Sequence, residues 1–341
     1  MRWPSGWRGC SARTPSDSER MTSEFRFDPL HRRWVIVSKE RHRRPNDYAD
    51  IGHQATLGSK CPFCEGNERQ TPPELMAERP DGSAPDGPGW TLRVVPNRFP
   101  AVTEESSEGF GRHEVLIESN QHVAPPAECA PEHQLAVMRA YRDRVRELGR
   151  DARIAYVVLF RNSGPRSGAS LAHPHTQIMG LELIPPAMRA ELEALADHRR
   201  DHDRCLACEL VGQELAQGDR ILGGEGGFVS YLPYAGRFPG ELCITSREHP
   251  APFGELGEND LRALTAVLMD AVRRTCRAFA EPSFNWVLHT VTGDDVQGGH
   301  HWRFDLLPRL GQFGGFELGT GLYINSIPPE EAVLRLRAAA D

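Results

Sequence analysis

The arrangement of cysteines and histidines along this chain occurs twice. Each copy is a C-x-x-C pair followed by two histidines: Cys61, Cys64, His122 and His173 in the first, and Cys205, Cys208, His249 and His301 in the second. The two histidines are 51 residues apart in the first copy and 52 in the second. A repeat of this kind predicts two similar units that bury their apolar faces together. We therefore expect a duplicated module.

The secondary-structure signals around the two copies agree with a duplication. Residues 131–150 and 259–279 carry apolar side chains at helical spacing, and each segment precedes a strand, a polar loop and a second strand. These strands are predicted over 154–160 and from 175 onward, and over 284–291 and 302–307. Further strands are expected over 25–27, 33–38, 90–95 and 113–118. We predict an α+β fold with one continuous, largely antiparallel sheet and helices packed on it.

The duplication also predicts where the chain divides. The two halves are expected to span residues 25–195 and 196–341. Residues 1–24 lack the apolar stretch of a secretory signal, and we expect them to form a disordered tail.

Composition argues against two classes of partner. The formal net charge is -7, with 40 basic and 47 acidic residues, so the chain lacks the basic character that nucleic-acid binding requires. No run of about 18 apolar residues is present, which argues against a membrane span.

Paired cysteines in a chain without a leader are typical of metal sites or redox dithiols. We expect a cytoplasmic enzyme.

The segment His173-Pro174-His175-Thr176-Gln177 is the most informative in the chain. In an extended strand, residues two apart face the same side, so both imidazoles and the Gln177 amide are expected to face one pocket. Residues 162–170 upstream form a loop of small residues whose N–H groups and hydroxyls can approach phosphate oxygens. The combination predicts phosphoryl transfer. The alternative is a set of surface histidines at a strand edge.

This loop, followed by H-P-H-x-Q, resembles the transferase branch of the histidine-triad superfamily, the galactose-1-phosphate uridylyltransferase family. The resemblance covers nearly everything after the tail and implies a duplicated histidine-triad-like module. In the hydrolase branch the strand is H-x-H-x-H, whereas Gln177 stands at the third position here. An amide can donate a hydrogen bond to a phosphoryl oxygen but has no titratable proton near neutral pH. The resemblance therefore implies a nucleotidyl-histidine that persists until a second phosphate acceptor arrives.

The resemblance also implies roles for individual residues. His175 is the expected nucleophile, attacking the α-phosphorus as a neutral imidazole, and Gln177 is expected to contact the phosphoryl group. The other residues implied to bind substrate are Asn97, Asn162, Gly168, Ser170 and, in the basic loop 39–45, Arg41 and Arg44. A solvated loop without a ligand is the alternative for the two arginines.

The two cysteine and histidine sets predict bound Zn²⁺. Two thiolates and two imidazoles form the closed tetrahedral set that is typical of structural zinc. In the first set, clamping of His173 would aim its neighbour His175. A redox dithiol is the alternative for Cys61 and Cys64.

The second set leaves more than one interpretation. Some family members use a glutamate and several histidines in this half, and Glu191, His289 and His301 would be remnants of that arrangement. We expect the cysteine set instead, because both cysteines occupy repeat-equivalent positions. Arg303 stands where the second half would carry its nucleophilic histidine, so we expect one nucleophile per chain, with Arg303 in an ion pair or near a phosphate.

The predicted function is that of a UDP-glucose–hexose-1-phosphate uridylyltransferase, in which UMP passes from UDP-glucose to galactose 1-phosphate through His175. An alternative with the same motifs uses ADP-glucose and inorganic phosphate, as ADP-glucose phosphorylase does. A less favoured alternative is a non-catalytic zinc-binding module.

The Gly-rich segment 313–325 has two interpretations as well. The resemblance implies a homodimer in which this segment helps to bind the sugar phosphate, in the partner's active site. The alternative is a plain β-hairpin loop. A helix is expected from Pro328.

Overall fold

The computed structural model describes residues 23–38, 61–106, 108–280, 283–291 and 300–340. The predicted tail, apart from its last two residues, and the basic loop with Arg41 and Arg44 lie outside the described residues. Within the described part of the chain, no helix combines the length and apolar character needed to cross a membrane.

Ten strands form one sheet in which every neighbouring pair is antiparallel. In spatial order they are β3 (Met76–Glu78), β4 (Leu92–Pro96), β5 (Gly111–Ile117), β7 (His175–Leu181), β6 (Tyr156–Ser163), β11 (Phe284–Val291), β12 (Arg303–Pro308), β10 (Leu242–Ser246), β9 (Phe228–Tyr231) and β8 (Ile221–Glu225). Counted inward from either edge of the sheet, the five strands of each half occur in the same relative chain order, and the two innermost strands, β6 and β11, pair with each other. The predicted α+β fold and its duplicated, largely antiparallel sheet are confirmed.

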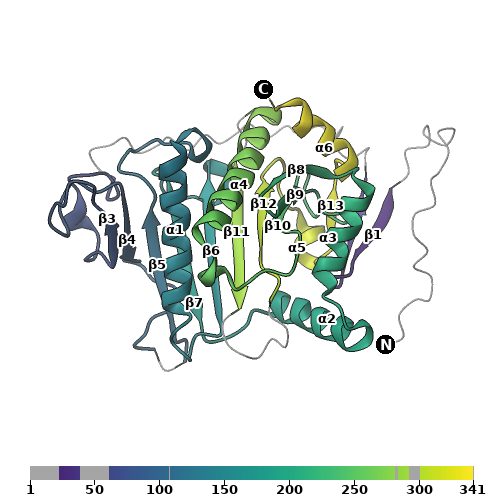
Figure 1. Ribbon diagram of the computed structural model, residues 1–341, viewed down its shortest axis with the longest axis horizontal. Coiled ribbons are helices and arrows are strands. Elements are labelled where there is room, and N and C mark those ends of the chain that lie inside the picture. Colours follow the sequence, from purple (N-terminus) through teal and green to yellow (C-terminus); the bar gives the residue numbers. More distant parts are fainter. Residues whose placement is uncertain (1–22, 39–60, 107, 281–282, 292–299, 341) are drawn as a thin grey trace.

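Two long helices cover one face of this sheet. They are α1 (Pro131–Leu148) and α4 (Glu258–Ala278), which lie side by side across the central strands (Figure 1). Each buries one apolar stripe, for example Leu135 and Met138 on α1 and Leu264 and Leu268 on α4, in the main hydrophobic core. The helix α6 (Pro329–Ala338) packs against α4. The opposite face of β5, β7, β6 and β11 is therefore left for the site.

The remaining elements join and flank the two halves. The helices α2 (Pro186–His202) and α3 (Leu206–Gln217) connect β7 to β8, and short 3-10 helices occur at Glu68–Gln70, Pro126–Glu128, Pro165–Ser167 and Phe253–Glu255. The predicted boundary at residue 195 lies within α2, and the division into two halves at that residue stays a prediction.

A second, three-stranded sheet lies at the end of the molecule opposite β3 (Figure 1). It contains β1 (Glu24–Asp28), β2 (Arg33–Val37) and β13 (Tyr323–Asn325). The Gly-rich segment before β13 is not a hairpin loop. It folds into a short helix, α5 (Gly315–Thr320), because the Glu317 carboxylate accepts from the N–H of Gly314 at the helix start and Gly321 ends it in a left-handed conformation.

Candidate functional site

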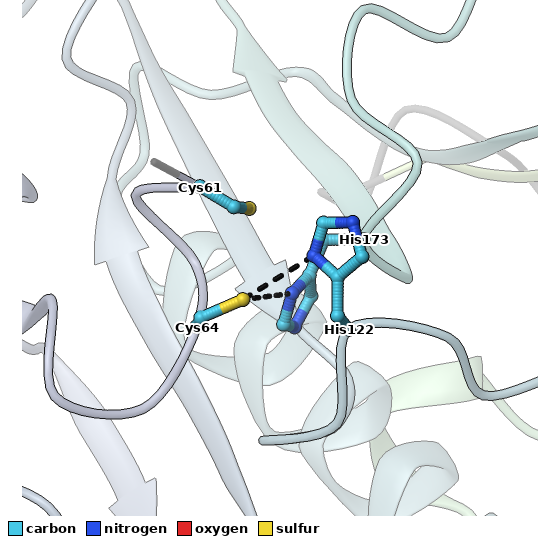
Figure 2. Close-up of side chains that lie close together, drawn as sticks. All are labelled: Cys61, Cys64, His122 and His173. Carbon is cyan, nitrogen blue, oxygen red and sulfur yellow. Dashed lines mark hydrogen bonds between the residues drawn. The ribbon is translucent and has the colours of Figure 1, made fainter. Parts of the chain in front are cut away.

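The first cysteine and histidine set forms a compact cluster. Figure 2 shows Cys61, Cys64, His122 and His173 converging from three separate segments of the chain. Their ligand atoms lie within 4.8 Å of one another. The Cys64 Sγ is 3.2 Å from Nδ1 of His122 and 3.6 Å from Nδ1 of His173.

The chemistry of this cluster fits zinc. Nε2 of His173 lies 2.7 Å from the backbone oxygen of Ser119, so this nitrogen donates and Nδ1 is left with a lone pair for a metal. Burial lowers the pKa of His173 to about 4, which keeps the ring neutral at physiological pH. Burial and the neighbouring Cys61 raise the pKa of Cys64 to about 11, so this thiol needs a bound cation to ionise. Two thiols and two imidazoles in this arrangement could hold a tetrahedral Zn²⁺.

The second set forms a matching cluster in the other half. The ligand atoms of Cys205, Cys208, His249 and His301 also lie within 4.8 Å of one another. Nε2 of His301 lies 3.3 Å from the backbone oxygen of Ser246, three residues before His249, just as His173 bonds to the residue three before His122. In both clusters the two imidazoles are edge to face, with ring centroids 5.5 Å apart. The second cluster can therefore hold a cation in the same way.

The glutamate alternative for the second set finds no support in the geometry. Glu191 is buried and forms a bidentate ion pair with Arg303, at 2.6 and 3.0 Å. Arg303 also donates to Asp305 at 3.0 Å, and His300 lies 3.1 Å from the same carboxylate of Glu191. The ring of His289 contacts the hydroxyl of Tyr156, which is not a ligand of either cluster. The ion-pair interpretation of Arg303 is the one that the structure shows.

His175 is buried at the start of β7, and His173 lies just before this strand. Nδ1 of His175 lies 2.8 Å from the backbone oxygen of His173. A carbonyl oxygen only accepts, so Nδ1 carries the proton and Nε2 keeps the lone pair. Burial lowers the pKa of His175, which favours the neutral ring. The Phe63 ring, between Cys61 and Cys64, packs against both imidazoles, 5.3 Å from His175 and 6.1 Å from His173. The first cluster therefore restrains the ring of His175.

Gln177 faces the same side of β7 as His175, because the two are separated by one residue in a strand. Its Oε1 lies 2.9 Å from Nε2 of His113 on β5. The N–H of Ala101 donates to the other ring nitrogen of His113 at 3.1 Å. Asn97 lies next to them, with its Nδ2 3.0 Å from the same Nε2. The structure thus brings Asn97 and Gln177 together around His113.

Opposite these residues, a buried polar network anchors β7 to α1. Thr176 donates to a carboxylate oxygen of Glu118 at 2.6 Å, and Tyr141 donates to the same oxygen at 3.0 Å. Arg161 of β6 forms an ion pair with Glu118 and stacks on Trp286, 4.9 Å from the ring centroid. All five side chains are buried. This network therefore holds β7, the strand that carries His175, against α1.

The predicted phosphate loop runs from Asn162 at the end of β6 to Ser170. Gly164 and Gly168 both have a positive φ, +82° and +86°, and Gly168 is in the left-handed helical conformation. The Ser167 hydroxyl donates to the Gly164 carbonyl at 2.6 Å, which closes the loop on itself. Gly168 and Ser170 are exposed, as a loop that receives a ligand requires.

Sequence reasoning missed two polar residues near these groups. His113 lies within strand β5, and Asn285 lies within strand β11, where it donates to Asn162. Neither residue belongs to a motif or to a repeat position. The one signal available was that each is a polar side chain within a predicted strand.

Comparisons with known proteins give the family. A family model described as the N-terminal domain of a domain of unknown function, DUF4931, matches residues 89–184. ADP-glucose phosphorylase of Arabidopsis thaliana is 31% identical over 340 residues, which cover 94% of this chain and 93% of that protein. Galactose-1-phosphate uridylyltransferase of Thermotoga maritima is 25% identical over 339 residues, covering 92% and 98%.

A solved structure agrees with the sequence comparison. The crystal structure of the Arabidopsis thaliana ADP-glucose phosphorylase with bound ADP-glucose superimposes with a TM-score of 0.81 at 30% identity, over 93% of this chain and 99% of that chain. The chain therefore belongs to the galactose-1-phosphate uridylyltransferase-like family of nucleotidyl-transferring enzymes, which includes ADP-glucose phosphorylase.

Proposed function

We propose that this enzyme is a nucleotide-sugar phosphorylase of the ADP-glucose type. Its relative of that name is 31% identical over nearly the whole length of both chains, against 25% for the Thermotoga maritima uridylyltransferase. The function first predicted from the sequence, uridylyl transfer to galactose 1-phosphate, is therefore less well supported than its adenine-nucleotide alternative. Both share the same chemistry at His175.

The observation that carries the mechanism is the hydrogen bond between Nδ1 of His175 and the His173 carbonyl. It leaves the Nε2 lone pair to attack the α-phosphorus of ADP-glucose. A P–N bond forms, the bond to the bridging oxygen breaks, and glucose 1-phosphate leaves with that oxygen and its electron pair. An oxygen of inorganic phosphate then attacks the adenylyl group, which releases ADP and restores the neutral imidazole.

The same hydrogen bond stabilises the charge that develops on the ring. When Nε2 bonds to phosphorus, the imidazole becomes cationic, and the Nδ1 proton then bonds more strongly to the carbonyl oxygen. Zinc bound at the first cluster would act as a structural ion that holds His173, and with it that carbonyl. Gln177 and Asn162 would donate to phosphoryl oxygens, with Asn97, Gly168 and Ser170 around them and Arg41 and Arg44 from the basic loop.

Transfer of label tests this proposal. We expect the wild-type enzyme, incubated with ADP-glucose labelled at the α-phosphorus, to retain an acid-labile label that inorganic phosphate releases as ADP. His175→Ala should retain none, whereas His198→Ala, a change in a histidine on α2 that pairs with Glu209, should label normally.

Two results would contradict the proposal in different ways. Labelling of His175→Ala would refute the covalent intermediate. Preferential labelling by UDP-glucose, with release by galactose 1-phosphate rather than by phosphate, would return the enzyme to the uridylyltransferase interpretation.

A further inference from the structure

Asn285 belongs to the second half of the chain but contacts the phosphate loop of the first half. It lies on β11 directly opposite Asn162 on β6, so both side chains are on the same face of the sheet. Its Nδ2 lies 2.7 Å from Oδ1 of Asn162 and 2.9 Å from the backbone oxygen of Ser167. The side chain is only 9% exposed, so these bonds are shielded from water.

The Ser167 carbonyl determines the direction of both hydrogen bonds. A carbonyl oxygen only accepts, so the atom of Asn285 that faces it is the amide nitrogen. The second hydrogen on this nitrogen goes to Asn162, whose facing atom is therefore its amide oxygen. Both N–H groups of Asn162 are left to donate elsewhere, and among the described residues none accepts from them.

Ser283, just before β11, supports the loop as well. The Oγ of Ser283 accepts a hydrogen bond from the N–H of Arg166 at 3.1 Å. Gly164 lies so close that a Cβ placed there would be 2.5 Å from that Oγ. The loop therefore rests directly on the segment of the second half that leads into β11.

We propose that Asn285 is a positioning residue of the nucleotide site, which holds the Asn162 amide with its N–H groups toward the phosphate oxygens. The inference rests on the proposed function, because it takes Asn162 as a phosphate ligand. With the amide reversed, the Asn162 oxygen would face a phosphate oxygen, and two acceptors would repel each other. The second half, without a nucleophile of its own, thus contributes to the site of the first.

Asn285→Asp removes the donors at nearly constant shape. A carboxylate cannot donate to Ser167, and we expect Asn162 to turn its own N–H groups toward it. The dissociation constant of ADP-glucose is measured by calorimetry in a His175→Ala background, where no turnover occurs. We expect Asn285→Asp to weaken binding by about tenfold to a hundredfold, the usual effect of losing one hydrogen bond to a charged group.

A double-mutant cycle separates positioning from general damage. If Asn285 acts through Asn162, then adding Asn285→Asp to Asn162→Ala should weaken binding by less than about twofold. If the Asn285→Asp protein folds poorly, Asn285→Ala takes its place in the cycle. This change also removes the donors, without adding charge, and should give the same result. Thr290→Val is the matched control, because Thr290 is also buried on β11 and donates to Val157 of β6 at 3.0 Å, outside the loop. It should leave the affinity unchanged.

The outcomes distinguish two kinds of failure. Additive effects of Asn162→Ala and Asn285→Asp, or an unchanged affinity in Asn285→Asp, would overturn the positioning role alone. If the His175→Ala protein binds neither ADP-glucose, UDP-glucose nor ADP, the phosphate-loop assignment and the proposed function are overturned together.

Discussion

Replacing Glu118 by glutamine tests the buried network behind the nucleophile strand. The change keeps the shape of the side chain and one oxygen that can accept from Thr176 and Tyr141. It removes the negative charge that faces Arg161. The guanidinium of Arg161 then stays buried against Trp286 without a counter-ion.

The expected cost follows from the burial of this pair. The side chains of Glu118 and Arg161 are 6% and 4% exposed, so neither charge can be solvated where it lies. Breaking such a buried pair costs about 3–5 kcal/mol of unfolding free energy. Thr176→Val removes one hydrogen bond of the same network and should cost about 1 kcal/mol. The loss of unfolding free energy in Glu118→Gln should therefore be about three to five times that in Thr176→Val.

Urea unfolding followed by tryptophan fluorescence measures these differences. Adding Arg161→Met to Glu118→Gln should recover part of the stability, because it removes the uncompensated charge. Glu132→Gln is the surface control, since its pair with Arg262 is largely exposed and should leave the transition unchanged. Equal costs for Glu118→Gln and Thr176→Val, with no recovery in the double variant, would refute the argument.

Two further predictions concern metal content and pH. Elemental analysis should give two zinc ions per wild-type chain and one fewer in Cys61→Ser and in Cys205→Ser, while Cys129→Ser keeps both; equal counts throughout would contradict the ligand sets. Burial lowers the pKa of His289 from 6.5 to about 4, so the unfolded chain binds the proton first and stability should be lost as pH falls between these values. The loss from His289 amounts to about 3 kcal/mol, so in urea titrations at about pH 7 and pH 4.5 His289→Gln should lower the total pH dependence by that amount, while other buried histidines such as His173 keep their share; the same pH dependence in both proteins would exclude His289 as a source.

The parts of the fold that could be predicted are those with a strong local pattern. The strand over 284–291 has the predicted bounds, and α1 and α4 begin and end within two residues of the predicted helices. Their apolar side chains recur at the spacing that burial on one face demands. The segment around α5 was predicted less well, because Gly-rich sequences fit several turns and the Glu317 contact that starts the helix is a local bond without a hydrophobic pattern.

The candidate site likewise has parts that the sequence predicts and parts that it does not. Both cysteine and histidine sets come together as the repeat predicted, because metal-ligand types at fixed spacing are visible in the sequence. The partners of Gln177 and Asn162 could not be foreseen in this way. His113 and Asn285 are 64 and 123 residues distant from them along the chain, and only the strand order brings them into contact. Sequence motifs identify groups with intrinsic chemistry, whereas the residues that orient those groups depend on the topology.

The central pairing of β6 with β11 has a consequence for how this molecule can be dissected or engineered. Each of these strands has eight residues, and the pairing runs along their whole length. Separate expression of the two halves would uncover two long strand edges, which favour recombination of the fragments or aggregation over independent folding. The two fragments of a split enzyme would therefore have to reassemble by pairing β6 with β11, and neither fragment alone would have the activity.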